Sequence, residues 1–146
     1  MSSLIGNKPN QVPTNGDLGS LAFQDSENVS IGLLRFDSGY GKSATAYGCR
    51  AWVNFNGTGT VAIRASGNVS SITDGGTGVY TVNFTTAMPD ANYSAVVTAS
   101  DNGATAIRTA KIEDSPAPTS SGFTISTVNT SAADFDVPYI FASVFR

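Results

Sequence analysis

The sequence predicts an all-β protein: an antiparallel, jelly-roll-like β-sandwich of about eight strands with an irregular N-terminal arm. Three observations support this fold class. Between Arg50 and Ser100, apolar residues alternate with small polar ones, and a repeat of two places the apolar residues on one face of a strand. Glycine or proline separates these runs, as in a meander of short antiparallel strands. No stretch of the 146 residues has the periodicity of a long helix.

The chain is expected to divide into an arm at residues 1–27, a short bridging segment at 28–48 and the β-sandwich domain at 49–146. Glycines and prolines interrupt the arm, and its scattered apolar residues are too few to form a core. Two interpretations stay open: a frayed terminus, or an arm that docks on another protein. In the second, the attachment residues would be Pro9, Val12, Pro13, Leu18, Leu21 and Phe23.

Eight runs are expected to form the strands of the domain. Breaks such as Gly75–Gly78 bound them, as does the loop with Pro116 and Pro118, which cannot donate to a ladder. The dipeptide Asn102-Gly103 predicts a hairpin turn, because both residues tolerate positive φ. The expected strands are 50–56, 60–66, 69–74, 79–84, 93–99, 106–113, 122–129 and 139–146.

The last run, residues 139–146, is apolar on both faces. Such a strand is usually buried between two layers, or it packs against a second subunit. We favour a homotrimer, because exposed apolar patches usually mark interfaces. The expected subunit contacts are Tyr139, Phe141, Val144 and Phe145.

Composition limits the partners. Eight Lys and Arg against eleven Asp and Glu give a formal charge of −3, so the chain lacks the basic field that holds nucleic acid. No apolar run approaches the roughly 18 residues that span a bilayer, which predicts no membrane insertion. The single Cys49 cannot form an internal disulfide.

The sequence predicts no catalytic site, cofactor or metal centre. It contains no histidine, which removes Ser-His-Asp and Cys-His catalysis and histidine metal sites. The acid pairs Glu113-Asp114 and Asp134/Asp136 lie in loops, where acids normally cap turns; the second pair is also a weak candidate for calcium. Trp52 could stack on a sugar or pack within the sheet.

Two parts of the sequence resemble proteins of marine bacteriophage particles. Residues 6–25, Gly-Asn-Lys-Pro-Asn-Gln-Val-Pro-Thr-Asn-Gly-Asp-Leu-Gly-Ser-Leu-Ala-Phe-Gln-Asp, are similar to the N-terminal segment of tail-fibre and other virion proteins. Residues 50–60 and 84–93 resemble C-terminal domains of phage fibre-like proteins. The resemblance implies a trimeric, non-enzymatic virion component whose arm lies on the particle and whose β domain faces outward.

Typical tail fibres are far longer, with a shaft between arm and head, whereas only residues 28–48 intervene here. We therefore expect a short tail fibre, or a capsid decoration or head-fibre protein, located in the virion and made in the host cytoplasm. Its expected partners are other copies of itself, capsid or tail proteins that bind the arm, and a host-surface glycan. The alternative is a free carbohydrate-binding module, which would have no use for a long irregular arm.

Overall fold

The structure is a computed structural model that describes residues 35–36, 44–45, 47–101, 103 and 107–146. The chain separates into two compact units, Met1–Thr45 and Ala46–Arg146. In the first unit, β1 (Arg35–Phe36) pairs antiparallel with β2 (Ala44–Thr45). The predicted arm with its six attachment residues, and most of the bridging segment, lie outside the described residues.

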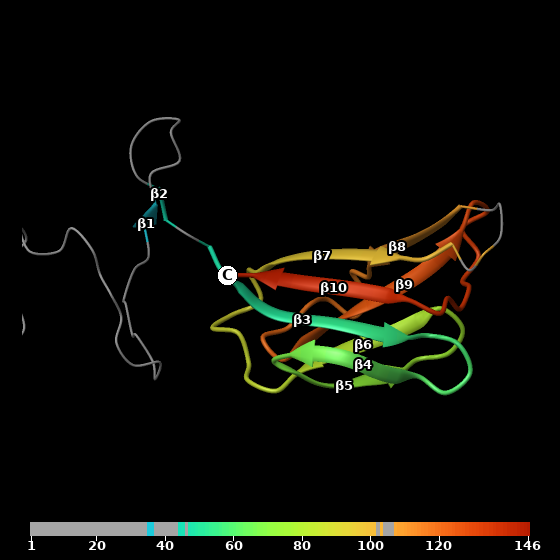
Figure 1. Ribbon diagram of the computed structural model, residues 1–146, viewed down its shortest axis with the longest axis horizontal. Coiled ribbons are helices and arrows are strands. Elements are labelled where there is room, and N and C mark those ends of the chain that lie inside the picture. The colour runs from blue at the N-terminus through green and yellow to red at the C-terminus, as the bar shows by residue number, and fades with distance from the viewer. Residues whose placement is uncertain (1–34, 37–43, 46, 102, 104–106) are drawn as a thin grey trace, which may run out of the picture. The chain divides into compact units, whose positions relative to one another are not determined.

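The second unit is a sandwich of two antiparallel, four-stranded sheets, which confirms the predicted fold class (Figure 1). The first sheet has the order β4-β3-β10-β7 and the second the order β5-β6-β9-β8. The strands are β3 (Cys49–Asn56), β4 (Ala62–Gly67), β5 (Val69–Asp74), β6 (Val79–Phe84), β7 (Ser94–Ala99), β8 (Arg108–Ile112), β9 (Gly122–Asn129) and β10 (Ile140–Phe145).

The chain moves between the sheets four times. Hairpins join β3 to β4, β5 to β6 and β8 to β9, and β10 returns to pair with both β3 and β7. β3 begins and β10 ends at the same end of the sandwich (Figure 1). The connections after β3, β5, β7 and β9 therefore lie at the other end.

The hairpin predicted at Asn102-Gly103 is wrong in one respect. Gly103 has a φ of 69° and its N–H donates to Asp101 Oδ1, so a turn is present; Asn102 lies outside the described residues. However, this turn joins β7 of the first sheet to β8 of the second, and the two strands share no ladder. The turn residues specify a change of direction, but which strands pair is decided by distant contacts.

The core lies between the two sheets, as the alternation predicts. Phe55 on β3 meets Tyr80 on β6 edge to face, with ring centroids 5.3 Å apart. Asn68, with a φ of 56°, forms the corner between β4 and β5. Its side-chain NH2 group donates to Arg50 O and Thr86 O, and its Oδ1 accepts the Thr86 N–H. The buried apolar residues are Ala51, Val53, Phe55, Val69, Tyr80, Val82, Phe84, Met88, Phe123, Ile125, Val128, Val137, Ile140, Ala142 and Val144.

Candidate functional site

The outer face of the first sheet carries exposed aromatic and aliphatic side chains. Strand pairing places Ser143 of β10 beside both Trp52 of β3 and Val96 of β7, and it places Phe141 beside Asn54. These neighbours point away from the core because the alternate residues of each strand fill it. We call this surface the open face; its residues are Trp52, Asn54, Arg64, Ser94, Val96, Thr98, Tyr139, Phe141, Ser143 and Phe145.

Exposure of the large side chains on the open face is substantial: 43% for Trp52, 59% for Val96, 46% for Tyr139 and 40% for Phe141. The pyrrole part of the Trp52 indole occupies the space that a side chain at Gly67 would fill, since a Cβ there would lie 2.5 Å from Nε1. Glycine at this position on β4 thus lets the indole lie close to the sheet.

The rings of Tyr139 and Phe141 are nearly parallel, with an interplanar angle of 9° and centroids 6.5 Å apart. The Arg64 guanidinium lies 4.1 Å above the Tyr139 ring, and its Nη1 donates to Pro138 O at 2.6 Å. Cation–π contact and hydrogen bond together hold the guanidinium against the ring while leaving further N–H donors. Beside Phe141, the Asn54 Oδ1 is buried without a hydrogen-bond partner.

A hollow of about 260 Å³ lies at the end of the open face where β10 ends. Arg146 Nη2 forms an ion pair with Asp90 Oδ2 at 2.5 Å, and Asp90 Oδ1 accepts the Asn92 N–H at 2.8 Å. The Asn92 backbone hydrogen bond, followed by the Arg146 charge, lowers the pKa of Asp90. We call this the end hollow; it is lined by Tyr47, Asn92, Ser94, Phe145 and Arg146.

The four predicted interface residues do not share one environment. Tyr139 and Phe141 are exposed on the open face, and Phe145 is half-buried beside the end hollow. Val144 is 1% exposed and faces the core with Ile140 and Ala142, so the inclusion of Val144 was wrong for this fold. Consecutive residues of a strand point to opposite faces, and Val144 follows the inward set.

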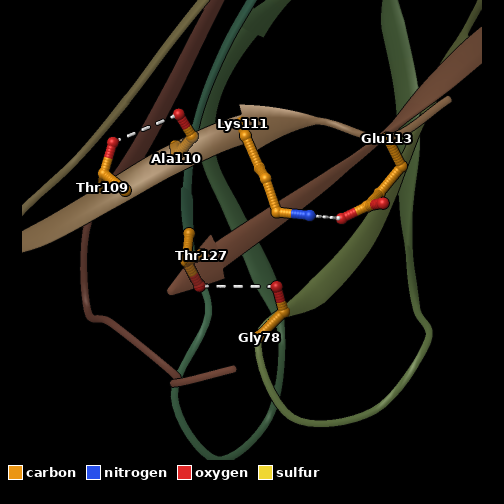
Figure 2. A network of polar contacts seen from close by, with 6 residues as sticks. All are labelled: Gly78, Thr109, Ala110, Lys111, Glu113 and Thr127. Atoms are coloured by element: carbon orange, nitrogen blue, oxygen red, sulfur yellow. Dashed lines mark hydrogen bonds and ion pairs between the residues drawn. The ribbon is translucent and has the colours of Figure 1, made fainter. Parts of the chain in front are cut away.

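The second sheet has a different outer surface. Lys111 Nζ on β8 pairs with Glu113 Oε1 at 2.5 Å (Figure 2). The Thr127 hydroxyl, which points toward Gly78 O in the same view, is buried on the inner side of β9. The hydrogen bond from Lys111 lowers the pKa of Glu113. A groove of about 120 Å³ lies beside Thr81 and Thr124 and is also lined by Pro116, Ala117, Thr119 and Ser121. The hydroxyls of those two threonines lie 3.0 Å apart and bond each other, so they already have partners.

The acidic pair Asp134/Asp136 serves the fold. Asp136 Oδ1 accepts the Gly78 N–H at 2.6 Å and lies 2.8 Å from the Tyr80 hydroxyl, which is also 2.8 Å from Gly57 O. Burial, and then the hydrogen bond with Asp136, raise the pKa of Tyr80 well above its ordinary value. Asp136 therefore ties the connection after β9 to two other turns, which is the turn-fixing role that acids commonly have in loops.

Among residues 47–101, 103 and 107–146, no three His, Cys, Asp or Glu side chains gather as a possible metal site. The part of the chain that the structure describes also has no helix long and apolar enough to cross a membrane. The absence of catalysis, cofactor and metal stays a prediction.

No protein-family model and no curated protein matches the sequence. Among solved structures, the chain is similar to the tailspike of phage phiAB6, crystallised with three-repeated oligosaccharides of Acinetobacter baumannii surface polysaccharide. The TM-score is 0.54 at 14% sequence identity, over 88% of this chain. The match spans only 31% of the tailspike chain. At this identity the likeness establishes a shared fold, so the architecture found here is one that a phage tailspike also uses.

Proposed function

We propose that this protein is a non-enzymatic structural component of a bacteriophage particle that presents its β-sandwich for attachment to the host surface. The observation that supports this most is the fold shared with a phage tailspike. The similarity of residues 6–25 and 50–60 to phage virion proteins points the same way. A short tail fibre, or a capsid decoration or head-fibre protein, is the form we favour, with the virion as its location.

The non-enzymatic assignment is supported by how the acidic side chains are used. Asp136 bonds Gly78 and Tyr80, Glu113 pairs with Lys111, and Asp90 pairs with Arg146. Carboxylates that already have partners are poorly placed to transfer protons, and the sequence offers no histidine to replace them.

The attachment model assigns residues 1–27 to the particle and residues 49–146 to the exterior. Full burial of an anchor such as Leu18 contributes about 1.5–3 kcal/mol, while ordering each backbone residue costs roughly 1–2 kcal/mol. One arm would therefore bind weakly, and three arms on a homotrimer would gain through effective concentration. Light scattering of the full chain tests this assembly: a 15.0 kDa species at micromolar concentration contradicts the trimer.

The anchor is tested by co-sedimentation with particles that lack the native protein. We expect the triple variant Leu18→Ala, Leu21→Ala, Phe23→Ala to lose association, as should deletion of residues 1–26. The matched control is Ile107→Ala, which also truncates an apolar side chain, 70% exposed, but lies in the sandwich domain. If the triple variant and the deletion still co-sediment, the sandwich and not the arm holds the particle.

A free carbohydrate-binding module is the second candidate. The observation that favours it is the row of exposed rings on the open face, since aromatic side chains are common in ligand sites. The same co-sedimentation experiment separates the two: a free module has no affinity for particles, with or without residues 1–26.

A further inference from the structure

We propose that the open face, together with the end hollow, binds an extended acidic polysaccharide. The inference rests on the proposed attachment function and names the ligand class that the sandwich would recognise. It depends on three features: a row of rings along one strand, a local excess of positive charge, and a hollow where the row ends.

The rings follow the outward positions of β10 and its preceding residue. Tyr139, Phe141 and Phe145 are separated by two and then four residues, so they lie on one side of the strand over about 20 Å, at roughly 3.3 Å per residue. Trp52 flanks this row on β3, and the rings are solvent-exposed in part. A linear polysaccharide presents apolar C–H faces of successive sugar rings at regular intervals, and such faces pack against aromatic side chains.

Polar side chains separate the rings. Ser143 lies between Phe141 and Phe145 on the outer side of β10, and Ser94 and Thr98 line the neighbouring strand β7. Their hydroxyls suit a ligand that carries hydroxyl groups along its whole length. A purely apolar partner would leave these groups without hydrogen bonds, which disfavours it.

The charge of this sheet is one-sided. Strands β3, β4, β7 and β10 contain no Asp or Glu, whereas they contain Arg50 and Arg64. Arg64 is held over Tyr139 at the distal end of the row, with N–H donors left for a carboxylate. A guanidinium beside an aromatic ring fits a uronate-type sugar, which offers a C–H face and a carboxylate together.

The end hollow offers the other kind of sugar contact. The Tyr47 ring is 75% exposed and Phe145 lines the same cavity, while Asp90 and Arg146 hold each other in fixed orientation. Amide and guanidinium groups can each bond neighbouring hydroxyls, as Asn92 and Arg146 would here. At about 260 Å³ the hollow is slightly smaller than a typical small-molecule site, so it would hold only one part of the polysaccharide.

A second copy of the chain is the rival occupant of the open face, and the charges disfavour it. Such a contact is the one expected from the sequence at Tyr139, Phe141 and Phe145, and it would place Arg64 of each copy in the interface with no acid from the same four strands to offset it. Like charges brought together across an interface oppose association. An acidic polysaccharide meets the same guanidinium groups with the opposite sign.

The test uses the tryptophan fluorescence of the full chain, because Trp52 is the only tryptophan and lies on the open face. The probes are oligosaccharides of alginate, hyaluronan and polygalacturonate, which differ in linkage but all carry uronates; dextran is the neutral control. We expect at least one acidic probe to change the Trp52 emission in a saturable way, and dextran to do so far more weakly.

Variants then locate the contact. Phe141→Thr, Tyr47→Ala and Arg64→Gln should each weaken binding of the acidic probe about tenfold, as loss of a central contact typically does. Arg64→Lys should retain part of the affinity because it retains the charge. The matched control Ile107→Thr removes an exposed apolar side chain outside the open face and should bind like the original chain. Circular dichroism checks that every variant is folded.

Three results would overturn the proposal: no emission change with any of the three acidic probes, equal binding of dextran, or unchanged binding by all of the open-face variants. Light scattering on the same variants tests the rival directly, since Phe141→Thr should leave the oligomeric state unchanged. If it dissociates the protein, the open face is the subunit contact. These measurements involve no attachment to particles, so a failure of the attachment model would be detected only by co-sedimentation.

Discussion

The two sheets of the sandwich share one core but end in different surfaces. In the second sheet, every residue of the central strand β9 from Gly122 to Val128 is buried, on both sides of the sheet. In the first sheet, the central strand β10 is buried only at Ile140, Ala142 and Val144, and Phe141 between them is 40% exposed. The fold therefore covers one sheet with its own chain and leaves the other open.

The cover of the second sheet comes from its connections. The Thr119–Gly122 bridge and the Val128–Asp134 bridge draw the segments before and after β9 back over it. Asn129 Oδ1 accepts N–H groups of Ser131 and Ala133, which closes the turn after the strand. No comparable segment among the described residues is paired over β10. The open face is left uncovered by these residues and carries aromatic rings and a guanidinium group. Such a surface is a candidate binding site for a partner.

The largest difference is expected from two phenylalanines of the central strands that face opposite ways, Phe123 toward the core and Phe141 toward the outside. Phe123 on β9 is 2% exposed and packs against Phe84 and Tyr93, whereas Phe141 on β10 is 40% exposed. Phe123→Ala should lower the free energy of unfolding by about 3–5 kcal/mol, and Phe141→Ala by less than about 1 kcal/mol. Chemical denaturation measures both. Equal losses would mean that the open face is already covered in the folded protein.

Two glycines sharpen the comparison at the level of backbone contact. A Cβ at Gly122 would collide with the Val82 carbonyl of the neighbouring strand, which cannot move without disturbing the ladder. Gly122→Ala should therefore destabilise by about 1–3 kcal/mol or more. A Cβ at Gly67 would meet only the Trp52 side chain, which can swing outward. Gly67→Ala should therefore lower the free energy of unfolding less than Gly122→Ala does, and it should shift the Trp52 emission. An unchanged emission spectrum would contradict the position given to the indole.

The Tyr80 hydroxyl links turns at the end of the sandwich opposite to the end of β10. Tyr80→Phe should cost about 1–3 kcal/mol, because Gly57 O and Asp136 lose a donor. The pKa of Tyr80 is raised from an ordinary 10.0, so the folded protein keeps a proton that the unfolded chain releases. Stability from this group is thus present below pH 10.0 and falls as pH rises above it.

Thermal melting between neutral and strongly alkaline pH checks this expectation. The alkaline loss of melting temperature should be smaller in Tyr80→Phe than in the original protein. Burial also raises the pKa of Tyr93, so part of the loss should survive in the variant, and Tyr93→Phe serves as the comparison. Identical alkaline profiles for Tyr80→Phe and the original protein would contradict the role given to this hydroxyl.

The strands were predictable because their signal is local. Alternation of Ala51, Val53 and Phe55 with polar residues places β3, and the same pattern places β6, whereas β10 is placed by a short run that is apolar on both faces. Sheet membership was not predictable in this way: the turn at Asp101–Gly103 carries a hairpin signal, yet it connects two sheets. Pairing β7 with β10 is decided by contacts across more than forty residues, which no turn motif encodes.

The sequence predicted part of the open face. The two-faced apolar pattern of residues 139–146 indicated an unusual strand, and Tyr139 and Phe141 are exposed; their role as subunit contacts stays a prediction. Arg64, Asn92 and Arg146 were missed, because they belong to three separate segments that only the fold brings to one surface. The absence of Asp and Glu from all four strands of that sheet is a sequence signal, but it is meaningful only once those strands are known to be neighbours.

The smallest effect is expected at the ion pair on the outer side of the second sheet. Lys111 and Glu113 are exposed, with side-chain exposures of 53% and 23%, and water screens such pairs strongly. Because the pKa of Glu113 lies below its ordinary 4.5 in the folded protein, the ionised carboxylate stabilises the fold above pH 4.5, and this stabilisation disappears as the pH falls. The free energy of unfolding of Glu113→Gln should therefore be slightly lower than that of the original protein at neutral pH and equal to it in acid. Asp114→Asn is the control. A loss as large as that of Tyr80→Phe would show that this pair, and not burial of β9, is what closes the second sheet.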